Sequence, residues 1–262
     1  MRPATLPRLC NSMNPKILSL DIETFPALAA VWTLWDASAL EVKQPSIICC
    51  YSAKWLGGKQ VTEALPDFRG YKPGKEDDSK LVQQLWDLLD QADAVVAHHG
   101  KRFDLPRINA RFAKHLLQPP SPYKIIDTRE IAAKVFGFGS NKLDYLCQYL
   151  GLGNKMQTGG YELWQDCMAG DMKAWKKMKA YNHHDVVLLE KLYLRLLPWI
   201  PDHPNYNIYN LQNGCTRCGS QKLQSRGMAH NNTRSYRRFQ CTVCGGWNRS
   251  TTMEKKTTIT NA

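Results

Sequence analysis

Apolar and polar residues along the chain, as far as residue 197, follow the periods of strands and helices in turn. Apolar runs of strand length predict strands over residues 16–20, 47–55, 60–65, 94–97 and 124–126. The pair Gly57-Gly58 suits a tight turn and predicts an antiparallel hairpin between the second and third of these strands. Apolar residues at helical spacing predict helices over residues 79–90, 105–116, 128–136, 140–150 and 172–197. Strands that alternate with helices indicate an α/β sheet with helices on its faces.

The pattern changes after the last of these helices, which indicates a second, smaller module. Pro198, Pro201 and Pro204 interrupt the helical period, and the asparagine-rich run NYNIYNLQNG follows them. Two cysteine pairs come next. We predict a disordered lead-in (1–15), a main domain (16–200), a linker (201–213), a cysteine module (214–250) and a disordered tail (251–262).

Two acids stand at the end of the first predicted strand, in the run KILSLDIETF. Asp21 and Glu23 are two residues apart, so on a strand both side chains point to one face while Ile22 points to the other. Burying two like charges is unfavourable unless a cation lies between them. Pairs of divalent ions held by such acids occur in enzymes that hydrolyse phosphodiesters. The pattern therefore predicts a metal site that further acids must complete.

Further acids and a tyrosine lie where such a site needs them. Asp104 follows the fourth predicted strand and opens a helix, and Asp185 lies on the last long helix. Tyr181 precedes Asp185 by four residues, so one helical face presents both side chains. Asp104 has a second interpretation, because aspartate is also a common N-cap. Asp127 ends the fifth strand and could face the metal site, although capping of the next helix is the preferred interpretation.

The order of these motifs resembles the proofreading-type 3′–5′ exonucleases of the ribonuclease H-like superfamily, in the branch that uses a tyrosine (the DEDDy type). More narrowly, the chain is similar to stand-alone bacterial and phage exonucleases of this type in the runs IICCYSAKWLGG, FDLPRINARF, SPYKIIDT, SNKLDYLCQYLGLG, TGGYELW and AYNHHDV. The resemblance covers residues 16–249. It implies an α/β fold with a mixed five-stranded sheet, its second strand antiparallel, flanked by helices and followed by a small zinc ribbon.

The resemblance also implies a role for each active-site residue. Asp21, Glu23 and Asp185 would hold one Mg2+ or Mn2+ ion. Asp21 would bridge to a second ion, whose shell Asp104 would complete through water. Tyr181 would orient the attacking water.

The histidines near these motifs depart from the family pattern. The histidine-using branch places its base five residues before the last acid, where this chain has Ala180. His183 and His184 are therefore expected to be exposed or bonded to neighbours, although a shift of register could bring one close. His99 stands where the family usually has asparagine. An imidazole can also donate a hydrogen bond, so we expect the geometry to survive while pH dependence and metal preference change.

The cysteines fall into two groups. The chain has no long apolar run or block typical of a signal peptide, so we expect a cytoplasmic location, or the host cytoplasm for a phage protein, with reduced thiols. Five of the nine cysteines lack ligand spacing and are interpreted as structural, namely Cys10, Cys49, Cys50, Cys147 and Cys167. Cys215-x-x-Cys218-Gly and Cys241-x-x-Cys244-Gly predict one closed, structural Zn2+ site of four thiolates. His230 lies between the pairs and is interpreted as a surface residue.

Positive charge concentrates in the cysteine module. The net charge is +12, and the segment from residue 205 on carries nine Lys or Arg against one Glu. Cations interleaved with aromatic residues suit single-stranded nucleic acid, although a basic hairpin that serves solubility or protein docking stays open. The candidate substrate contacts are His99, Lys101, Asn141, Lys142 and Tyr161 in the main domain, and Arg226, Arg234, Tyr236, Arg237 and Arg238 in the module.

These features favour a metal-dependent 3′–5′ exonuclease that hydrolyses nucleic-acid 3′ ends by a two-metal-ion mechanism. DNA and RNA both stay open as substrate, with single-stranded DNA somewhat favoured. A structure-specific endonuclease that uses the same acids is one alternative, and a non-catalytic nucleic-acid-binding adaptor is another. We expect no membrane partner, while a polymerase or repair protein could act with this chain in trans.

Overall fold

The structure is a computed structural model that describes residues 14–259 except 34, 36, 37, 211 and 212. Cys10 and most of the predicted lead-in lie outside the described residues. The chain divides into two compact units, one of Lys16–Leu194 and one that contains the chain from Arg195 onward.

The first unit is built on a mixed five-stranded sheet, which confirms the predicted fold class. The strand order is β5-β4-β1-β6-β7. Central β1 (Ile17–Phe25) pairs antiparallel with β4 (Ile47–Trp55) and parallel with β6 (Ala94–Ala97). β5 (Gln60–Ala64) is the hairpin partner of β4 at one edge, and β7 (Lys124–Asp127) lies parallel to β6 at the other.

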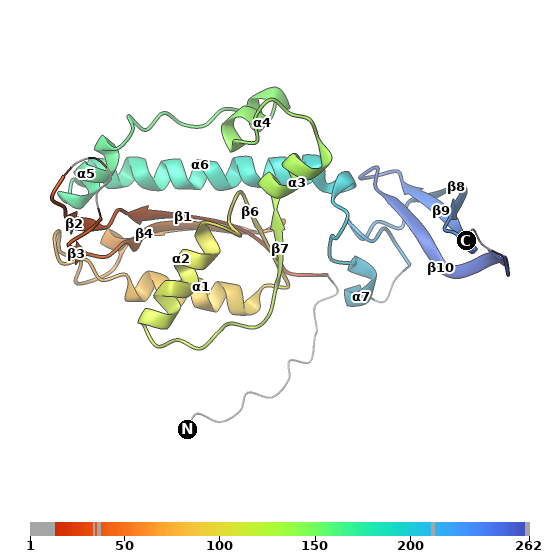
Figure 1. Cartoon of the computed structure of the whole chain (residues 1–262), viewed down its shortest axis with the longest axis horizontal. Helices are drawn as coiled ribbons and strands as arrows, with labels where there is room; N and C mark the ends of the chain where they lie inside the picture. Colours follow the sequence, from red (N-terminus) through yellow and green to blue (C-terminus); the bar gives the residue numbers. More distant parts are fainter. Residues whose placement is uncertain (1–13, 34, 36–37, 211–212, 260–262) are drawn as a thin grey trace, which may run out of the picture. The chain divides into compact units, whose positions relative to one another are not determined.

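Helices cover both faces of this sheet (Figure 1). Figure 1 shows α1 and α2 on one face and the long α6 along the other. The helices are α1 (Ser79–Gln91), α2 (Asp104–Lys114), α3 (Thr128–Val135), α4 (Leu143–Tyr149), α5 (Glu162–Met168) and α6 (Met172–Leu196), with a 3-10 turn, η1, at Leu65–Asp67.

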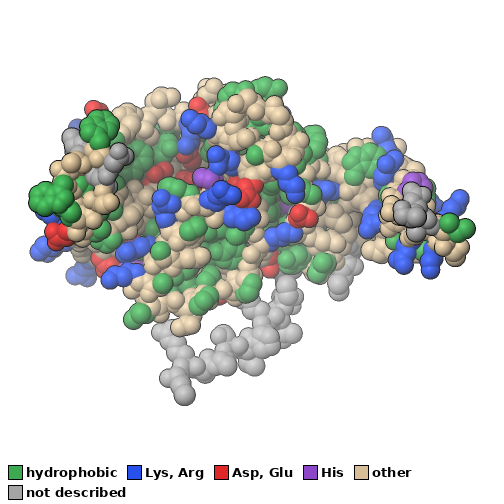
Figure 2. All heavy atoms as spheres, viewed as in Figure 1, with side chains coloured by type: hydrophobic (Ala, Val, Ile, Leu, Met, Phe, Trp, Pro, Cys, Tyr) green, Lys and Arg blue, Asp and Glu red, His purple; other side chains and the backbone are tan. Residues whose placement is uncertain are grey.

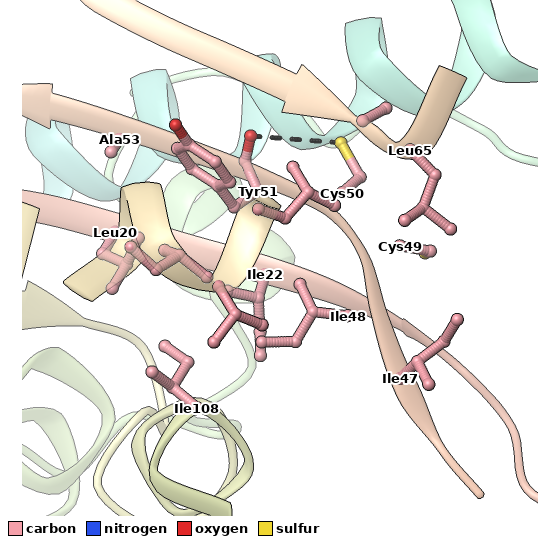
Figure 3. Packing of buried hydrophobic residues seen from close by; sticks show 14 of the residues in the cluster. Leu20, Ile22, Ile47, Ile48, Cys49, Cys50, Tyr51, Ala53, Leu65 and Ile108 are labelled. Carbon is pink, nitrogen blue, oxygen red and sulfur yellow. Dashed lines mark hydrogen bonds between the residues drawn. The ribbon is translucent and has the colours of Figure 1, made fainter. Parts of the chain in front are cut away.

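The two faces of β1 have different chemistry, as strand alternation predicts. Ile22 is 3% exposed, and Figure 3 shows it gathered with Ile48 and Ile108 on the α2 side of the sheet. Full burial of a side chain of this size contributes about 2 kcal/mol. Because Asp21 and Glu23 flank Ile22, the packing of Ile22 directs both acids to the opposite, α6 face.

A β-bulge lies beside these acids. Glu23 pairs with Cys50, but the next residue, Thr24, pairs with Ile48, so Cys49 is the extra residue on β4. Bulges bend a strand and change where its side chains point. Cys49 and Cys50 are both fully buried, in agreement with their interpretation as small apolar residues of the core.

A buried ion cluster fixes α1 and α2 to β4. The Asp78 carboxylate is fully buried and accepts hydrogen bonds from Arg111 Nε at 2.7 Å, Arg111 Nη2 at 2.6 Å and the Ile48 amide at 3.0 Å. His115 Nε2 lies 2.7 Å from the same carboxylate. Oxygen atoms of Asp77 and Asp78 also converge with His115, yet the Arg111 guanidinium already provides the countercharge there. We therefore interpret this cluster as structural.

Three segments differ from the sequence-based expectation. α5 forms where we predicted no helix, because its apolar pair at helical spacing is too short to reveal a period. β2 (Leu28–Ala30) and β3 (Glu41–Gln44) form an unexpected small hairpin. The predicted disordered tail is wrong for residues 251–256, since β10 (Trp247–Lys256) continues through them. Its polar residues gave no strand signal, but their backbone pairs with β9 (Arg234–Cys241).

The second unit contains a three-stranded antiparallel sheet of order β10-β9-β8, with β8 at Leu223–His230. Asn231 Oδ1 accepts hydrogen bonds from the amides of Thr233 and Arg234 at 3.1 and 2.7 Å, which closes the turn between β8 and β9. A 3-10 turn, η2 (Leu197–Trp199), and α7 (Tyr206–Asn210) precede the sheet. Among the residues that the structure describes, no helix has the length and apolar character needed to cross a bilayer.

Candidate metal centre and nucleic-acid interface

Three acids from two elements converge between the sheet and α6. Asp21 and Glu23 come from β1, and Asp185 comes from the facing surface of α6. Each offers a carboxylate oxygen, and these oxygens all lie within 4.8 Å of one another. The structure therefore brings together three of the acids that the sequence analysis singled out, and β1 continues beyond Glu23 to Phe25.

Asp104, at the start of α2, contacts β1 beside this group but is not one of the three acids whose oxygens converge within 4.8 Å. β6 pairs with β1 only as far as Ser19, so the amide of Ile22 has no strand partner on this side. Asp104 Oδ1 accepts a hydrogen bond from that amide at 3.2 Å. The N-cap interpretation of Asp104 is wrong, because α2 starts at Asp104 and Phe103 holds the N-cap position.

Gly100 permits this approach of the β6–α2 loop. A Cβ atom on Gly100 would lie 2.3 Å from Ala97 Cβ and 3.3 Å from Asp104 Oδ2. The first distance is shorter than any tolerated carbon contact, so a side chain here would displace the loop that carries Asp104.

Burial makes the acids difficult to ionise without a countercharge. Burial, with a further contribution from Asp185, raises the pKa of Glu23 to about 8. Burial also raises the pKa of Asp104 to about 6. For Asp21, burial and then the neighbouring Asp104, Glu23 and Asp185 raise the pKa well above its ordinary value.

These residues fit divalent cations. Asp185 Oδ1 is buried and has no hydrogen-bond partner among the described residues, and a cation would supply a partner for this oxygen. Every donor atom in the group is a carboxylate oxygen, the ligand that Mg2+ and Mn2+ prefer. The donor set therefore agrees with the ions that the family resemblance implies.

Two further side chains of this group were missed in the sequence. Asn182 is fully buried and donates from Nδ2 to Asp21 Oδ2 at 2.7 Å. It precedes Asp185 by three residues, so helical spacing could have revealed it. Lys155 Nζ lies 2.6 Å from Asp185 Oδ2 and 3.0 Å from Tyr181 Oη. Lys155 belongs to the irregular segment between α4 and α5, where no period relates it to the acids.

Asp127 caps α3 and does not join the acids, which confirms the preferred interpretation. Its Oδ1 accepts from the amides of Arg129 and Glu130 at 3.0 and 3.3 Å. The same carboxylate accepts from the amides of His99 and Lys101 at 3.0 and 3.2 Å. Asp127 therefore holds the loop that precedes Asp104.

The two histidines of this loop have different surroundings. His99 has a φ of 70°, a left-handed conformation in which asparagine is more common, and its Nδ1 lies 2.8 Å from Arg129 Nη1. His98 donates from Nε2 to the Asn141 carbonyl at 2.9 Å, and its Nδ1 lies 2.9 Å from the Thr128 hydroxyl. Burial lowers the pKa of His98 to about 4, so a neutral His98 joins the loop to α3 and to the segment before α4.

Neither histidine next to Asp185 points to the acids. His183 Nδ1 lies 3.1 Å from Thr62 Oγ1 of β5. His184 Nε2 lies 2.8 Å from the Asn154 carbonyl oxygen. Both are bonded to neighbours, as the sequence favoured.

The four paired cysteines converge in the second unit, and their sulfur atoms lie within 4.8 Å of one another. Cys215 Sγ is 3.6 Å from Cys244 Sγ, and Cys218 Sγ is 3.7 Å from Cys241 Sγ. Tetrahedral Zn2+ with bonds of about 2.3 Å would separate its sulfurs by about 3.8 Å. The observed spacing therefore fits one zinc ion and is far too long for disulfides.

The two knuckles have matching backbone geometry. Cys215 N donates to Ser220 O at 2.8 Å, and Cys241 N donates to Gly246 O at 2.9 Å. Gly219 and Gly245, which follow the second cysteine of each pair, have φ of 72° and 79°. A residue with a side chain would be strained at both positions, which explains the repeated Cys-Gly.

The sheet of the second unit carries two cation–aromatic stacks. The Arg238 guanidinium lies 4.7 Å from the Trp247 ring centroid, and that of Arg249 lies 4.5 Å from the Tyr236 ring. Arg238 and Arg249 are paired across β9 and β10, so they share one face of the sheet. Tyr236 is only 8% exposed and offers no free ring face, and Arg237 pairs with Glu254 at 3.3 Å.

The other predicted substrate contacts differ from one another in their bonding partners and in their exposure. Lys101 Nζ pairs with Glu130 at 3.2 Å, and Arg226 bonds Gln224. Asn141 Oδ1 is buried, and no described residue forms a hydrogen bond with it. Seven of the ten predicted contacts are exposed, namely Lys101, Lys142, Tyr161, Arg226, Arg234, Arg237 and Arg238. Figure 2 shows Lys and Arg side chains spread over the displayed faces of both units.

Comparison with known proteins agrees with this architecture. A search of curated proteins finds no match. Among solved structures, the family B DNA polymerase from the hyperthermophilic archaeon Pyrobaculum calidifontis is similar, with a TM-score of 0.53 and 15% identity over 84% of this chain. The matched region is 31% of the polymerase, so this chain spans about a third of that protein, and the likeness concerns the fold alone.

A family model described as RNase_H superfamily matches residues 42–197. The match contains Asp104, Tyr181 and Asp185, whereas Asp21 and Glu23 precede it. The family match covers more than half of the chain, and the matched residues include four of the five strands of the mixed sheet. This chain is therefore a member of the RNase_H superfamily.

Proposed function

We propose that this protein is a metal-dependent 3′–5′ exonuclease that removes nucleotides from the 3′ end of a single nucleic-acid strand. The observation that carries the proposal is the convergence of Asp21, Glu23 and Asp185 oxygens within 4.8 Å, where one buried Asp185 oxygen has no hydrogen-bond partner in the part of the chain that the structure describes. The resemblance of the motifs to tyrosine-type exonucleases supports the direction of cleavage.

Each side chain has a defined task in this proposal. Asp21, Glu23 and Asp185 would hold one Mg2+ or Mn2+, and Asp104 would join Asp21 around a second. Such ions, when bound, activate water and stabilise the leaving oxygen. Asn182 holds the Asp21 carboxylate in place through its 2.7 Å bond. Tyr181 would orient the attacking water, because its phenol oxygen lies beside Asp185 and shares the Lys155 ammonium with it.

The second unit would hold the strand, with one structural Zn2+ on its four cysteines. A site filled by four thiolates has no open position for substrate, so we assign it no catalytic part. Arg238 and Arg249 stack on aromatic rings, which fixes their guanidinium groups while leaving N–H donors for phosphates. Contact with about five phosphates would give a logarithmic salt slope of about −3.5 for a single strand.

The test is digestion of 5′-labelled DNA and RNA oligonucleotides, each with a free or a blocked 3′ end. With Mg2+ or Mn2+, a free 3′ end should give a ladder of single-nucleotide steps, and chelator or a blocked end should abolish it. Asp185→Asn should remove activity, whereas Asp87→Asn, an exposed acid on α1, should leave it unchanged. Discrete internal cuts in the blocked substrate would instead indicate an endonuclease. Binding without cleavage under every condition would indicate an adaptor.

A further inference from the structure

Lys155 brings a positive charge into the acid group from a segment without regular structure. Its ammonium lies 2.6 Å from Asp185 Oδ2 and 3.0 Å from Tyr181 Oη, and 5.0 Å from the centre of the Tyr181 ring. The side chain is mostly buried. One cation therefore contacts the acid and the phenol that the proposed reaction uses together.

The backbone around Lys155 is held by hydrogen bonds to two helices. Lys155 N donates to Asp144 Oδ1 of α4 at 2.9 Å, and the Asn154 carbonyl accepts from His184 of α6 at 2.8 Å. Farther along, Lys177 Nζ of α6 donates to the Thr158 carbonyl at 2.8 Å. The structure thus fixes where the Lys155 side chain enters the site, and His184 has a supporting role there.

The chemistry of the contact limits what Lys155 can do. An ammonium group is only a donor, so the Tyr181 oxygen accepts from it and the phenol proton must point elsewhere. Charge gives a second constraint. Four carboxylates balance two divalent ions, and a bound phosphodiester then adds one negative charge that Lys155 can offset.

We propose that Lys155 is a positioning residue with two alternative tasks. Without a divalent cation, Lys155 neutralises Asp185. When a divalent cation binds the Asp185 carboxylate, Lys155 no longer pairs with that carboxylate. Lys155 keeps its hydrogen bond to Tyr181 and orients the phenol toward the attacking water. The second task rests on the proposed nuclease function, whereas the first does not.

The two tasks predict effects of opposite sign for Lys155→Met. The ammonium competes with a divalent ion for Asp185, so its removal should tighten Mn2+ binding about tenfold. The same change leaves Tyr181 without its donor, so turnover at saturating Mn2+ should fall about 100-fold. Replacement of a residue that merely supports the fold would weaken Mn2+ binding and slow turnover together. Lys155→Arg keeps the charge and should stay close to wild type in Mn2+ affinity.

The experiment is calorimetric titration of Mn2+ into the metal-free full-length chain without nucleic acid, followed by single-turnover digestion at saturating Mn2+. Lys177→Met is the matched control, because it removes a lysine bonded to the same segment but away from the acids. Unchanged or weaker Mn2+ binding by Lys155→Met, with Lys177→Met like wild type, would overturn the first task. Tighter binding with undiminished turnover would overturn the second. If the wild-type chain cuts nothing, the proposed function fails, while the Mn2+ comparison still decides the first task.

Discussion

Replacing Glu23 by glutamine should stabilise the metal-free protein near pH 8. Burial and Asp185 raise the pKa of Glu23 from 4.5 to about 8, so the folded protein keeps a proton that the unfolded chain releases. Stability is therefore lost as pH rises from about 4.5 to about 8, and it is retained below this window. Because each unit of pKa difference corresponds to 1.36 kcal/mol, the loss in the free energy of unfolding is about 5 kcal/mol at most.

Thermal unfolding of the chelator-treated protein measures this effect. For a domain of this size, 1 kcal/mol corresponds to about 2–4 °C, so Glu23→Gln should melt about 10 °C above wild type near pH 8. Near pH 4.5 the two proteins should melt together, because wild-type Glu23 is then protonated in the folded state. Added Mn2+ should raise the melting temperature of wild type near pH 8 far more than that of the variant.

Glu162→Gln provides the control, because Glu162 is an exposed glutamate outside the acid group. It should shift the melting temperature little, and equally at both pH values. If metal-free Glu23→Gln melts with wild type near pH 8, or gains the same amount near pH 4.5, our account of the buried acids is refuted.

Three further outcomes follow from the geometry. Gly100→Ala puts a methyl group 2.3 Å from Ala97 Cβ, so the free energy of unfolding in urea should fall by about 1–3 kcal/mol and Mn2+ binding should weaken. Wild-type values for both measurements would contradict the close approach of Gly100 to Ala97. Cys244→Ser should lower bound zinc in atomic absorption and expose the chain after residue 195 to trypsin, while the Mn2+ response persists; full zinc content would contradict the four-thiolate site. Because burial lowers the pKa of His98 to about 4, wild type should lose stability, by up to about 3 kcal/mol, as pH falls from 6.5 to 4. His98→Gln should flatten this part of the stability curve, and an unchanged curve would contradict the buried neutral imidazole.

The regular part of the first unit could be predicted because its elements bury one face or both. β6 is a continuous apolar run and β4 begins with one, and the predicted bounds of both strands match the structure. The same alternation that buries Ile22 places Asp21 and Glu23 on the opposite face, so the acid pair could be predicted with the strand.

The parts that were missed lack such a pattern. The position of Lys155 depends on hydrogen bonds to α4 and α6, which join residues far apart in the sequence. The end of β10 is exposed and polar, and backbone pairing with β9 holds it rather than buried side chains. Asn182 is the exception, because it shares a helical face with Asp185 and helical spacing predicts their proximity.

The most direct test of the central claim is anomalous diffraction from crystals of the full chain containing Mn2+. Two peaks about 3.5–4 Å apart are expected, one in contact with Asp21, Glu23 and Asp185 and the other between Asp21 and Asp104. Absence of manganese from these carboxylates at saturating Mn2+ would contradict the account.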